Sequence, residues 1–378
     1  MPDCINAFVE RNENTHYLYG PWVDFLLLGG AALVVMLIYL LWFPGQDTTA
    51  TLAAAVLIAH AINHPHFAVS YQIFYADFFK KLKGQGYTQN LRLRYLIVGV
   101  IIPFALISFF VFSFVAQQPA TLGHSVNLMF FLVGWHYVKQ GYGCLMVDTT
   151  LKKAFFDQAA KRVLLVNCYV CWIYAWINAN QLLTTYNYWG INYSTFGFPI
   201  WLVTSVMSLA IVTTVVALVI LVRHGSKVGT MFPVNGLVGY VSAIYVWTIV
   251  PYLNPSFAIL IPAFHSLQYI AIAGRYEINR SRSQTADKPK RENTLTRSWI
   301  SFYRHYIGFF LVSVTLGYLG FWGAPEIIAK YTTLDGFFAD GSRAIFFCFW
   351  IFINVHHYFL DSVMWRRENP DVRTYLFS

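Results

Sequence analysis

The chain has 378 residues, of which 57% are hydrophobic and only 11% charged, well below the roughly 25% of an average soluble domain. This composition excludes a disordered chain, a collagen-like chain and a charge-covered nucleic-acid-binding domain, because too little polar surface exists to cover so large a core. An integral-membrane protein remains, and its net charge of +9 is read first as a signal of membrane topology.

Apolar segments that approach the length of a bilayer crossing recur along the whole chain. A transmembrane helix needs about 20 apolar residues. Ten segments qualify: 22–43, 52–75, 95–117, 124–146, 162–182, 199–222, 234–251, 255–275, 305–323 and 343–365. The sequence therefore predicts an all-α, polytopic membrane helix bundle of about ten transmembrane helices, which forms a single integral-membrane domain over 1–378. Segment 234–251 is short. If it does not form a transmembrane hairpin with a neighbouring segment, the number of spans falls to eight.

The basic residues fall almost entirely in the connections on one side of the predicted membrane spans. Clusters follow the second, fourth, sixth, eighth and tenth segments, whereas the connections after the first, third, fifth and seventh carry no Lys or Arg. Because cytoplasmic loops are enriched in these residues, both termini are expected to be cytoplasmic. The longest hydrophilic stretch, 276–304, is then a basic cytoplasmic loop that attracts anionic lipid. The first 21 residues predict no cleavable signal, and we expect a bacterial inner-membrane protein.

Seven of the eleven histidines fall in the interior of predicted spans, where an ionisable side chain is costly and marks a functional site by default. They are His60, His64 and His66 in 52–75, His136 in 124–146, His265 in 255–275, and His356 and His357 in 343–365. All four spans are even-numbered, so they are expected to run in the same direction. Each carries a histidine roughly 11 to 14 residues from its outer end, which places the rings in one layer of the membrane.

Polar side chains follow three of these histidines at helical spacing. The pairs are His357 with Asp361, His136 with Gln140, and His265 with Gln268. Offsets of three or four residues stack side chains on one helix face, which suits a carboxylate or amide that orients a metal-bound imidazole or itself coordinates. Tyr142 and Tyr269 are expected to line the site. Lys139 either contacts an anion or substrate there or extends its ammonium group towards the interface.

Span 52–75 carries its three histidines on two helix faces. His60 and His64 are one turn apart, whereas His66 lies about 200° around the helix from His64. Pro65 removes a backbone donor and presses against the carbonyl of Ala61, so we expect a kink that turns His66 inwards or breaks the helix beside a cavity. His64 is the expected metal ligand of this span, together with either His60 or His66.

The donor set favours non-haem iron. Neutral imidazole suits iron, zinc, copper and nickel, and no cluster of thiolates accompanies the histidines, so Cu(I) and iron–sulfur centres are disfavoured. The ligands would be drawn from the seven histidines and Asp361. Without a soluble domain, the substrate is expected to be small or to arrive from the lipid phase. The expected partners are membrane lipids, a lipophilic substrate and an electron donor, and nucleic acid is not expected.

Two short motifs carry a resemblance to known enzymes. The run from His60 to His64 and the doublet His356–His357 resemble the histidine boxes of integral-membrane fatty-acid desaturases and hydroxylases, although position 353 is Ile rather than a further histidine. The chain is also similar to bacterial membrane carotenoid-cleaving dioxygenases in placing histidines on several spans. The resemblance implies an oxygen-dependent oxidation of a lipid by hydroxylation, desaturation or oxidative cleavage.

Two other functions stay open at this point. Two histidines on facing helices could bind a haem axially, which would make the protein a bis-histidine membrane redox protein. Alternatively, the histidines and Asp361 could relay protons or bind a cation in a proton-coupled or metal-ion transporter. Pro65 and Pro262, both within spans, suit the interrupted helices of transporters.

Overall fold

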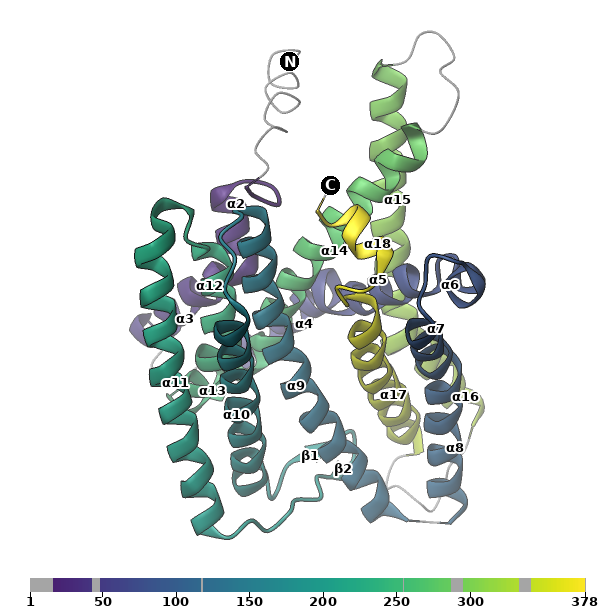
Figure 1. The fold of residues 1–378 in the computed structure, drawn as a ribbon. Coiled ribbons are helices and arrows are strands. Elements are labelled where there is room, and N and C mark those ends of the chain that lie inside the picture. Colours follow the sequence, from purple (N-terminus) through teal and green to yellow (C-terminus); the bar gives the residue numbers. More distant parts are fainter. Residues whose placement is uncertain are drawn as a thin grey trace. The chain divides into compact units, whose positions relative to one another are not determined.

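The computed structural model describes residues 16–42, 48–116, 118–253, 255–286, 295–332 and 341–377. These residues are almost entirely helical (Figure 1). Within them the single sheet is a short antiparallel hairpin of β1 (Asn187–Tyr188) and β2 (Ile191–Asn192). The prediction of an all-α protein is confirmed.

Eight helices in the described part of the chain are long and apolar enough to cross a membrane. They are Pro21–Leu41, Leu52–Tyr75, Gln89–Val115, Gln158–Leu182, Ile200–Met231, Phe257–Gln284, Tyr306–Tyr331 and Arg343–Met364. Each coincides with one of the ten predicted spans. The other two predicted spans, 124–146 and 234–251, fall on a longer, more polar helix and on the shorter apolar helix Val234–Val250. The protein is thus an integral-membrane helical protein, while the count of ten spans and the cytoplasmic termini stay predictions.

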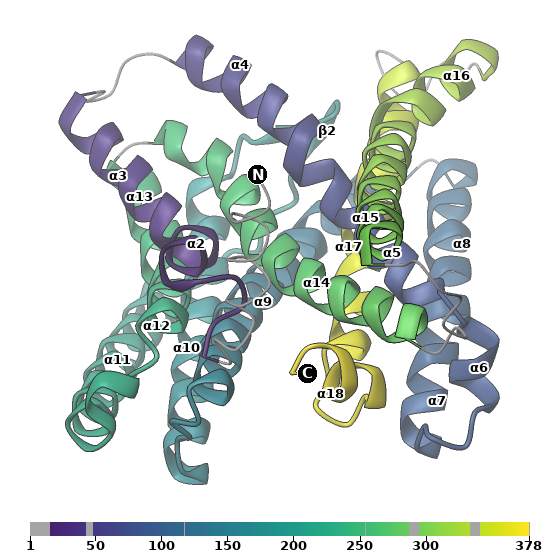
Figure 2. The same cartoon turned by 90° about the horizontal axis from the view of Figure 1, so that it is seen from above.

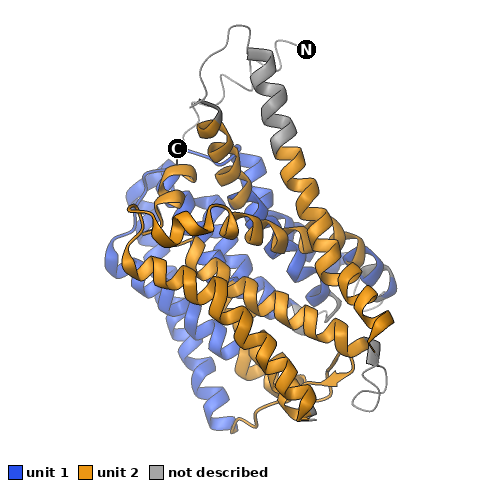
Figure 3. Ribbon diagram, turned by 90° about the vertical axis from the view of Figure 1, so that its right-hand side faces the viewer, with its two compact units in different colours: residues 1–55, 137–175, 200–272 blue, residues 56–136, 176–199, 273–378 orange. Residues whose placement is uncertain are grey.

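The chain divides into two compact units that alternate along the sequence (Figure 3). The first comprises 1–55, 137–175 and 200–272, and the second comprises 56–136, 176–199 and 273–378. The prediction of a single domain over 1–378 stays a prediction.

The first unit contains α2 (Pro21–Phe25), α3 (Ala31–Trp42), α11 (Ile200–Val228), α12 (Val234–Val241) and α13 (Trp247–Leu253). The second contains α5 (His64–Tyr75), α6 (Phe78–Lys83), α7 (Gln89–Leu96), α8 (Ile102–Val115), α15 (Leu295–Tyr318), α16 (Ala324–Tyr331), α17 (Gly341–Met364) and α18 (Pro370–Tyr375). Four helices contribute residues to both: α4 (Thr48–Ile58), α9 (Pro119–Leu151), α10 (Gln158–Leu182) and α14 (Ile261–Ala286). Short 3₁₀ helices lie at Gly229–Met231 and Pro255–Leu260.

Wider, π-helical turns interrupt the apolar helices at five places in the described residues. They are Leu26–Gly30, Ala59–Asn63, Ile97–Ile101, Ser242–Val246 and Leu319–Gly323. Pro65, Pro103 and Pro325 each stand at the start of the α-helix that follows such a turn. Proline has no N–H to donate and its ring presses on the carbonyl four residues earlier, and a wider preceding turn relieves both problems. The interruption expected at Pro65 takes this form.

Close helix packing in the second unit holds α5 in place. Helix α5 packs against α15 and α17 (Figure 2). Gly317 of α15 makes the approach possible, because a Cβ at this position would lie only 2.6 Å from the carbonyl carbon of His64. An apolar core of α8, α9, α17 and the hairpin, built around Phe110, Val126 and Phe347, supports the other side of α17. The histidine-bearing segments are therefore fixed by backbone-to-backbone contact and by packing.

The basic segment 276–304 differs from the expected loop over much of its length. Helix α14 continues to Ala286 and α15 begins at Leu295. Residues 287–294 lie outside the described part of the chain. Several of the basic residues that the sequence assigns to a cytoplasmic loop, Arg280 among them, are therefore carried on a helix.

Candidate metal centre

Three buried ligand-type side chains come together in the second unit. His357 and Asp361 lie one turn apart on α17, and His136 reaches them from α9. The Nε2 atoms of His136 and His357 lie 3.6 Å and 3.5 Å from the same atom, Oδ2 of Asp361. The side chains are only 7%, 0% and 4% exposed, respectively. The two imidazole rings lie 5.0 Å apart, close to perpendicular at 75°.

The distances in this cluster fit a shared metal ion better than direct hydrogen bonds. An N–H···O hydrogen bond joins atoms 2.7–3.2 Å apart. Two ligands bound to one ion at about 2.0–2.2 Å lie about 3.3–3.6 Å apart at the tetrahedral angle. The two separations measured here fall in the second range, and the ligand atoms of all three residues lie within 4.8 Å of one another. His136, His357 and Asp361 could therefore hold a metal ion.

His66 brings a third imidazole next to His357. The two rings lie 4.8 Å apart at 87°, and both side chains are buried. The Nδ1–H of His66 donates to the backbone carbonyl of Asn63, at the end of the π-helical turn before Pro65. This bond fixes the ring orientation and leaves the lone pair on Nε2, which is how proteins commonly prepare a histidine for metal binding.

His356 is the neighbour of His357 in sequence, but its ring makes different contacts. Its Nε2–H donates to the carbonyl of Val98 at 2.9 Å, and its Nδ1 accepts from the hydroxyl of Tyr71 at 2.8 Å. Both nitrogens are thus engaged, and in this arrangement the ring has no lone pair to offer to a metal. We therefore leave His356 out of the proposed ligand set, and assign it to joining α17, α5 and the turn before α8.

His60 and His64 lie in an aromatic environment. The ring of His64 stacks on Phe321 at 4.5 Å and contacts the ring of His60 at 5.0 Å. His60 is half-buried and donates from Nδ1 to the carbonyl of Val56 on its own helix. His64 is 1% exposed, and within the described residues neither of its nitrogens has a hydrogen-bond partner. The structure thus brings His66, rather than His60 or His64, next to His357.

The remaining predicted site residues belong to the first unit. His265 is buried there, with its ring stacked on Tyr137 at 4.3 Å. The amide of Gln140 donates to the carbonyl of His265 at 2.8 Å and to Oε1 of Gln268 at 3.1 Å. The amide of Gln268 donates in turn to a backbone carbonyl, that of Leu28. Both amides are therefore engaged in hydrogen bonds that join helices.

The predicted tyrosines and lysine lie in the same unit. The hydroxyl of Tyr142 donates to the carbonyl of Lys161 at 3.4 Å, and the ammonium group of Lys139 lies 5.9 Å from the centre of the Tyr142 ring. Tyr269 is buried. Whether any of the predicted residues, in either unit, acts on a metal or a substrate stays a prediction.

Sequence reasoning did not show which groups orient the histidines. Tyr71 and the carbonyl of Asn63 fix the rings of His356 and His66, and Phe67 packs its ring 4.6 Å from that of His357. A local signal existed only for Asn63, which precedes His66 by three residues on the same chain segment. The partner of Tyr71 is 285 residues away in sequence, and only the folded chain reveals it.

No known protein family, curated protein or solved structure matches this chain. The fold and the site therefore define only a class: an integral-membrane helical protein with a buried histidine–aspartate cluster that could bind a metal ion.

Proposed function

We propose that this protein is an integral-membrane metalloenzyme that binds non-haem iron and oxidises a lipophilic substrate with oxygen. The observation that supports the proposal is the placement of two imidazole nitrogens about one carboxylate oxygen, at 3.5 and 3.6 Å, inside the protein. Two histidines and one carboxylate, with further positions open, are the ligand set typical of non-haem iron oxygenases. Burial of three such side chains is costly without a cation to compensate the carboxylate.

His136, His357 and Asp361 would hold the iron in this proposal, and His66 would supply a further imidazole. Asp361 contributes the negative charge that lowers the cost of a buried cation. The Asn63 carbonyl keeps the proton of His66 on Nδ1, so that Nε2 is the nitrogen that can bind. These three histidines and the aspartate all belong to the second unit.

Bound iron in such a site supplies the activation of molecular oxygen for reaction with a C–H or C=C bond. The chain's own part is to position the apolar reactant and to exclude water. Phe67 lies against His357 and, at 5.0 Å, against Phe321, which stacks on His64. This aromatic series offers an apolar surface beside the proposed ligands. Hydroxylation or desaturation would also need an electron donor, whereas oxidative cleavage of a C=C bond by oxygen needs none.

Metal analysis of the purified protein, together with its absorption spectrum, tests the proposal. We expect iron in about stoichiometric amount and no Soret band. His136→Ala should lose the iron, whereas the matched variant His124→Ala, at an exposed position, should retain it. A Soret band would establish haem instead, and protein that binds no metal under reducing, iron-replete conditions contradicts the proposal.

A further inference from the structure

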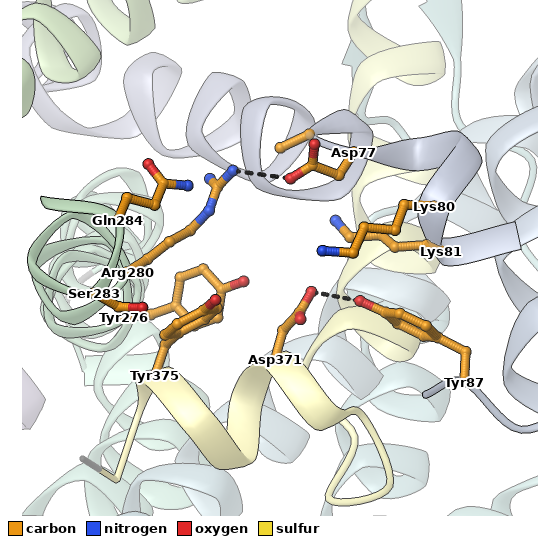
Figure 4. Close-up of a pocket in the computed structure, with 11 residues that line it drawn as sticks. Asp77, Lys80, Lys81, Tyr87, Tyr276, Arg280, Ser283, Gln284, Asp371 and Tyr375 are labelled. Atoms are coloured by element: carbon orange, nitrogen blue, oxygen red, sulfur yellow. Dashed lines mark hydrogen bonds and ion pairs between the residues drawn. The ribbon is translucent and has the colours of Figure 1, made fainter. Parts of the chain in front are cut away.

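A polar cavity lies in the second unit, apart from the cluster of buried histidines. Its volume is about 210 Å³. Its walls come from the end of α5 and from α6, from the last turns of α14 and from α18 (Figure 4). The candidate spans Leu52–Tyr75 and Phe257–Gln284 end here, and α18 follows the span Arg343–Met364. Lipid headgroups are expected at the ends of such spans, and therefore at the level of this cavity.

Cationic side chains outnumber carboxylates among the lining residues. Lys80, Lys81 and Arg280 face Asp77 and Asp371, which leaves one net positive charge. Both ammonium groups point into the cavity from α6, with the hydroxyl groups of Tyr276 and Tyr375 facing them from the opposite side (Figure 4).

The carboxylates of the lining already have partners. Asp371 accepts a hydrogen bond of 2.8 Å from the hydroxyl of Tyr87, and Asp77 pairs with Arg280 at 3.5 Å. Arg280 is also held by Glu277, at 3.3 Å. These contacts engage both carboxylates, and the ammonium groups of Lys80 and Lys81 also point into the cavity (Figure 4).

Lys81 is buried and held in place by the end of α5. Its ammonium group donates to the carbonyls of Ile73 and Phe74 at 2.7 and 3.0 Å, where the last carbonyls of the helix attract a cation. An ammonium has three donors, so one remains for a ligand. Burial lowers the pKa of Lys81 to about 8, with partial compensation by Asp371 and Asp77. A bound anion would offset the cost of this buried charge. Lys80 is exposed and has more freedom to adjust.

We propose that this cavity binds a phosphate group, either of a lipid headgroup or of a free phosphate. Phosphate oxygens accept hydrogen bonds from lysine ammonium and tyrosine hydroxyl groups, and basic pockets at this depth suit lipid headgroups. A volume of 210 Å³ equals that of about seven water molecules at 30 Å³ each, enough for a headgroup but not for acyl chains.

Calorimetric titration of the full-length protein in dodecyl maltoside tests this proposal, with three probes. Dioctanoyl phosphatidylglycerol carries the phosphate, dioctanoylglycerol has the same chains without it, and inorganic phosphate lacks the chains. We expect the phospholipid to bind and dioctanoylglycerol not to bind. Inorganic phosphate that binds as tightly as the phospholipid would support the phosphate site and identify a free phosphate as its source. Equal binding of the two dioctanoyl lipids would overturn the proposal.

A lysine series shows whether binding occurs in the cavity. Lys80→Ala should weaken phospholipid binding about fivefold, as expected for loss of one exposed charge pair of roughly 1 kcal/mol. Lys80→Arg should restore most of the affinity. Lys83→Ala is the matched control, because Lys83 is an exposed lysine of the same helix outside the lining. Equal effects of Lys80→Ala and Lys83→Ala, or no effect of either, would show that the cavity is not the binding site. The outcome does not depend on bound metal.

Discussion

Two clusters of buried polar side chains, one in each unit, differ in the distances that join their atoms. In the first unit, Asn167 donates to the hydroxyl of Tyr240 at 3.0 Å. In the second, His136 and His357 hold their Nε2 atoms 3.6 and 3.5 Å from one oxygen of Asp361. The first distance is a hydrogen bond that joins helices inside a membrane protein. The others are the separations of atoms that could share an ion. Burial of polar groups alone therefore does not mark a ligand site, whereas their spacing does.

Removal of the carboxylate should have the largest effect. We expect Asp361→Asn to lower iron affinity more than about 100-fold, because loss of a ligand should exceed the 10–100-fold cost of losing a group that only orients one. Iron per protein after dialysis against a chelator measures the effect. Asp157→Asn is the matched control, since Asp157 is exposed and caps the backbone N–H of Ala160, which an asparagine can also do. Unchanged iron in Asp361→Asn contradicts the proposed ligand set.

The neighbouring histidines of α17 allow a sharper test within one helix turn. His357→Ala should lose iron, whereas His356→Ala should retain it and lower the free energy of unfolding by about 2–4 kcal/mol. The cost arises because the Val98 carbonyl and the Tyr71 hydroxyl lose their partner. Metal content and the thermal unfolding midpoint separate the two effects. If His356→Ala releases iron as fully as His357→Ala, the assignment of the two rings is wrong.

The polar network of the first unit should affect stability alone. Asn167 also donates to Tyr245 at 2.7 Å and accepts from Thr213 at 3.0 Å, so Asn167→Ala should cost about 2–3 kcal/mol of unfolding free energy. Its iron content should match that of the parent protein. Asn90→Ala, at an exposed position of α7, is the control and should change neither quantity. Iron loss in Asn167→Ala would contradict the claim that this hydrogen-bonded cluster affects stability alone.

The smallest expected effect is the contribution of Lys81 to the pH dependence of folding stability. Its pKa is about 8 in the folded protein, below the 10.5 of an unburied lysine. Between these values the unfolded chain binds more protons, so this group makes stability rise with pH from about 8 towards 10. Above that range the raised pKa of Tyr87, caused by burial and by Asp371, acts in the opposite direction. Unfolding midpoints at pH 7.5, 8.5 and 9.5 in Lys81→Met should show a flatter rise. An identical slope contradicts this account of Lys81.

Much of the fold follows from local sequence signals. Composition and apolar length predict the eight helices that are long enough to span a membrane, and proline chemistry predicts the interruption at Pro65. The helical continuation of α14 to Ala286 could not be predicted, because charged residues suit both a solvated loop and an exposed helix face. The predicted span 124–146 lies within one helix, α9, whose polar side chains lower its hydropathy without interrupting the helix.

Less of the candidate site is visible in the sequence. The period of the helix places His357 and Asp361 on one face, and the depth of His136 in its span brings it to the same level. The engagement of His356 could not be predicted, because its partner Tyr71 is 285 residues away. In the sequence, the lysines and the arginine of the polar cavity indicate only a membrane topology. Their convergence depends on how the ends of α5, α14 and α18 pack in the second unit.

X-ray absorption at the iron edge of the purified, iron-loaded protein tests the central claim most directly. The account predicts a shell of nitrogen and oxygen ligands at about 2.0–2.2 Å, with the outer-shell scattering of two or three imidazoles and no sulfur ligand. In Asp361→Asn the iron should be lost or its shell altered, while Asp157→Asn should leave the spectrum unchanged. A porphyrin signature, a sulfur shell, or a spectrum that does not respond to Asp361→Asn would contradict the claim.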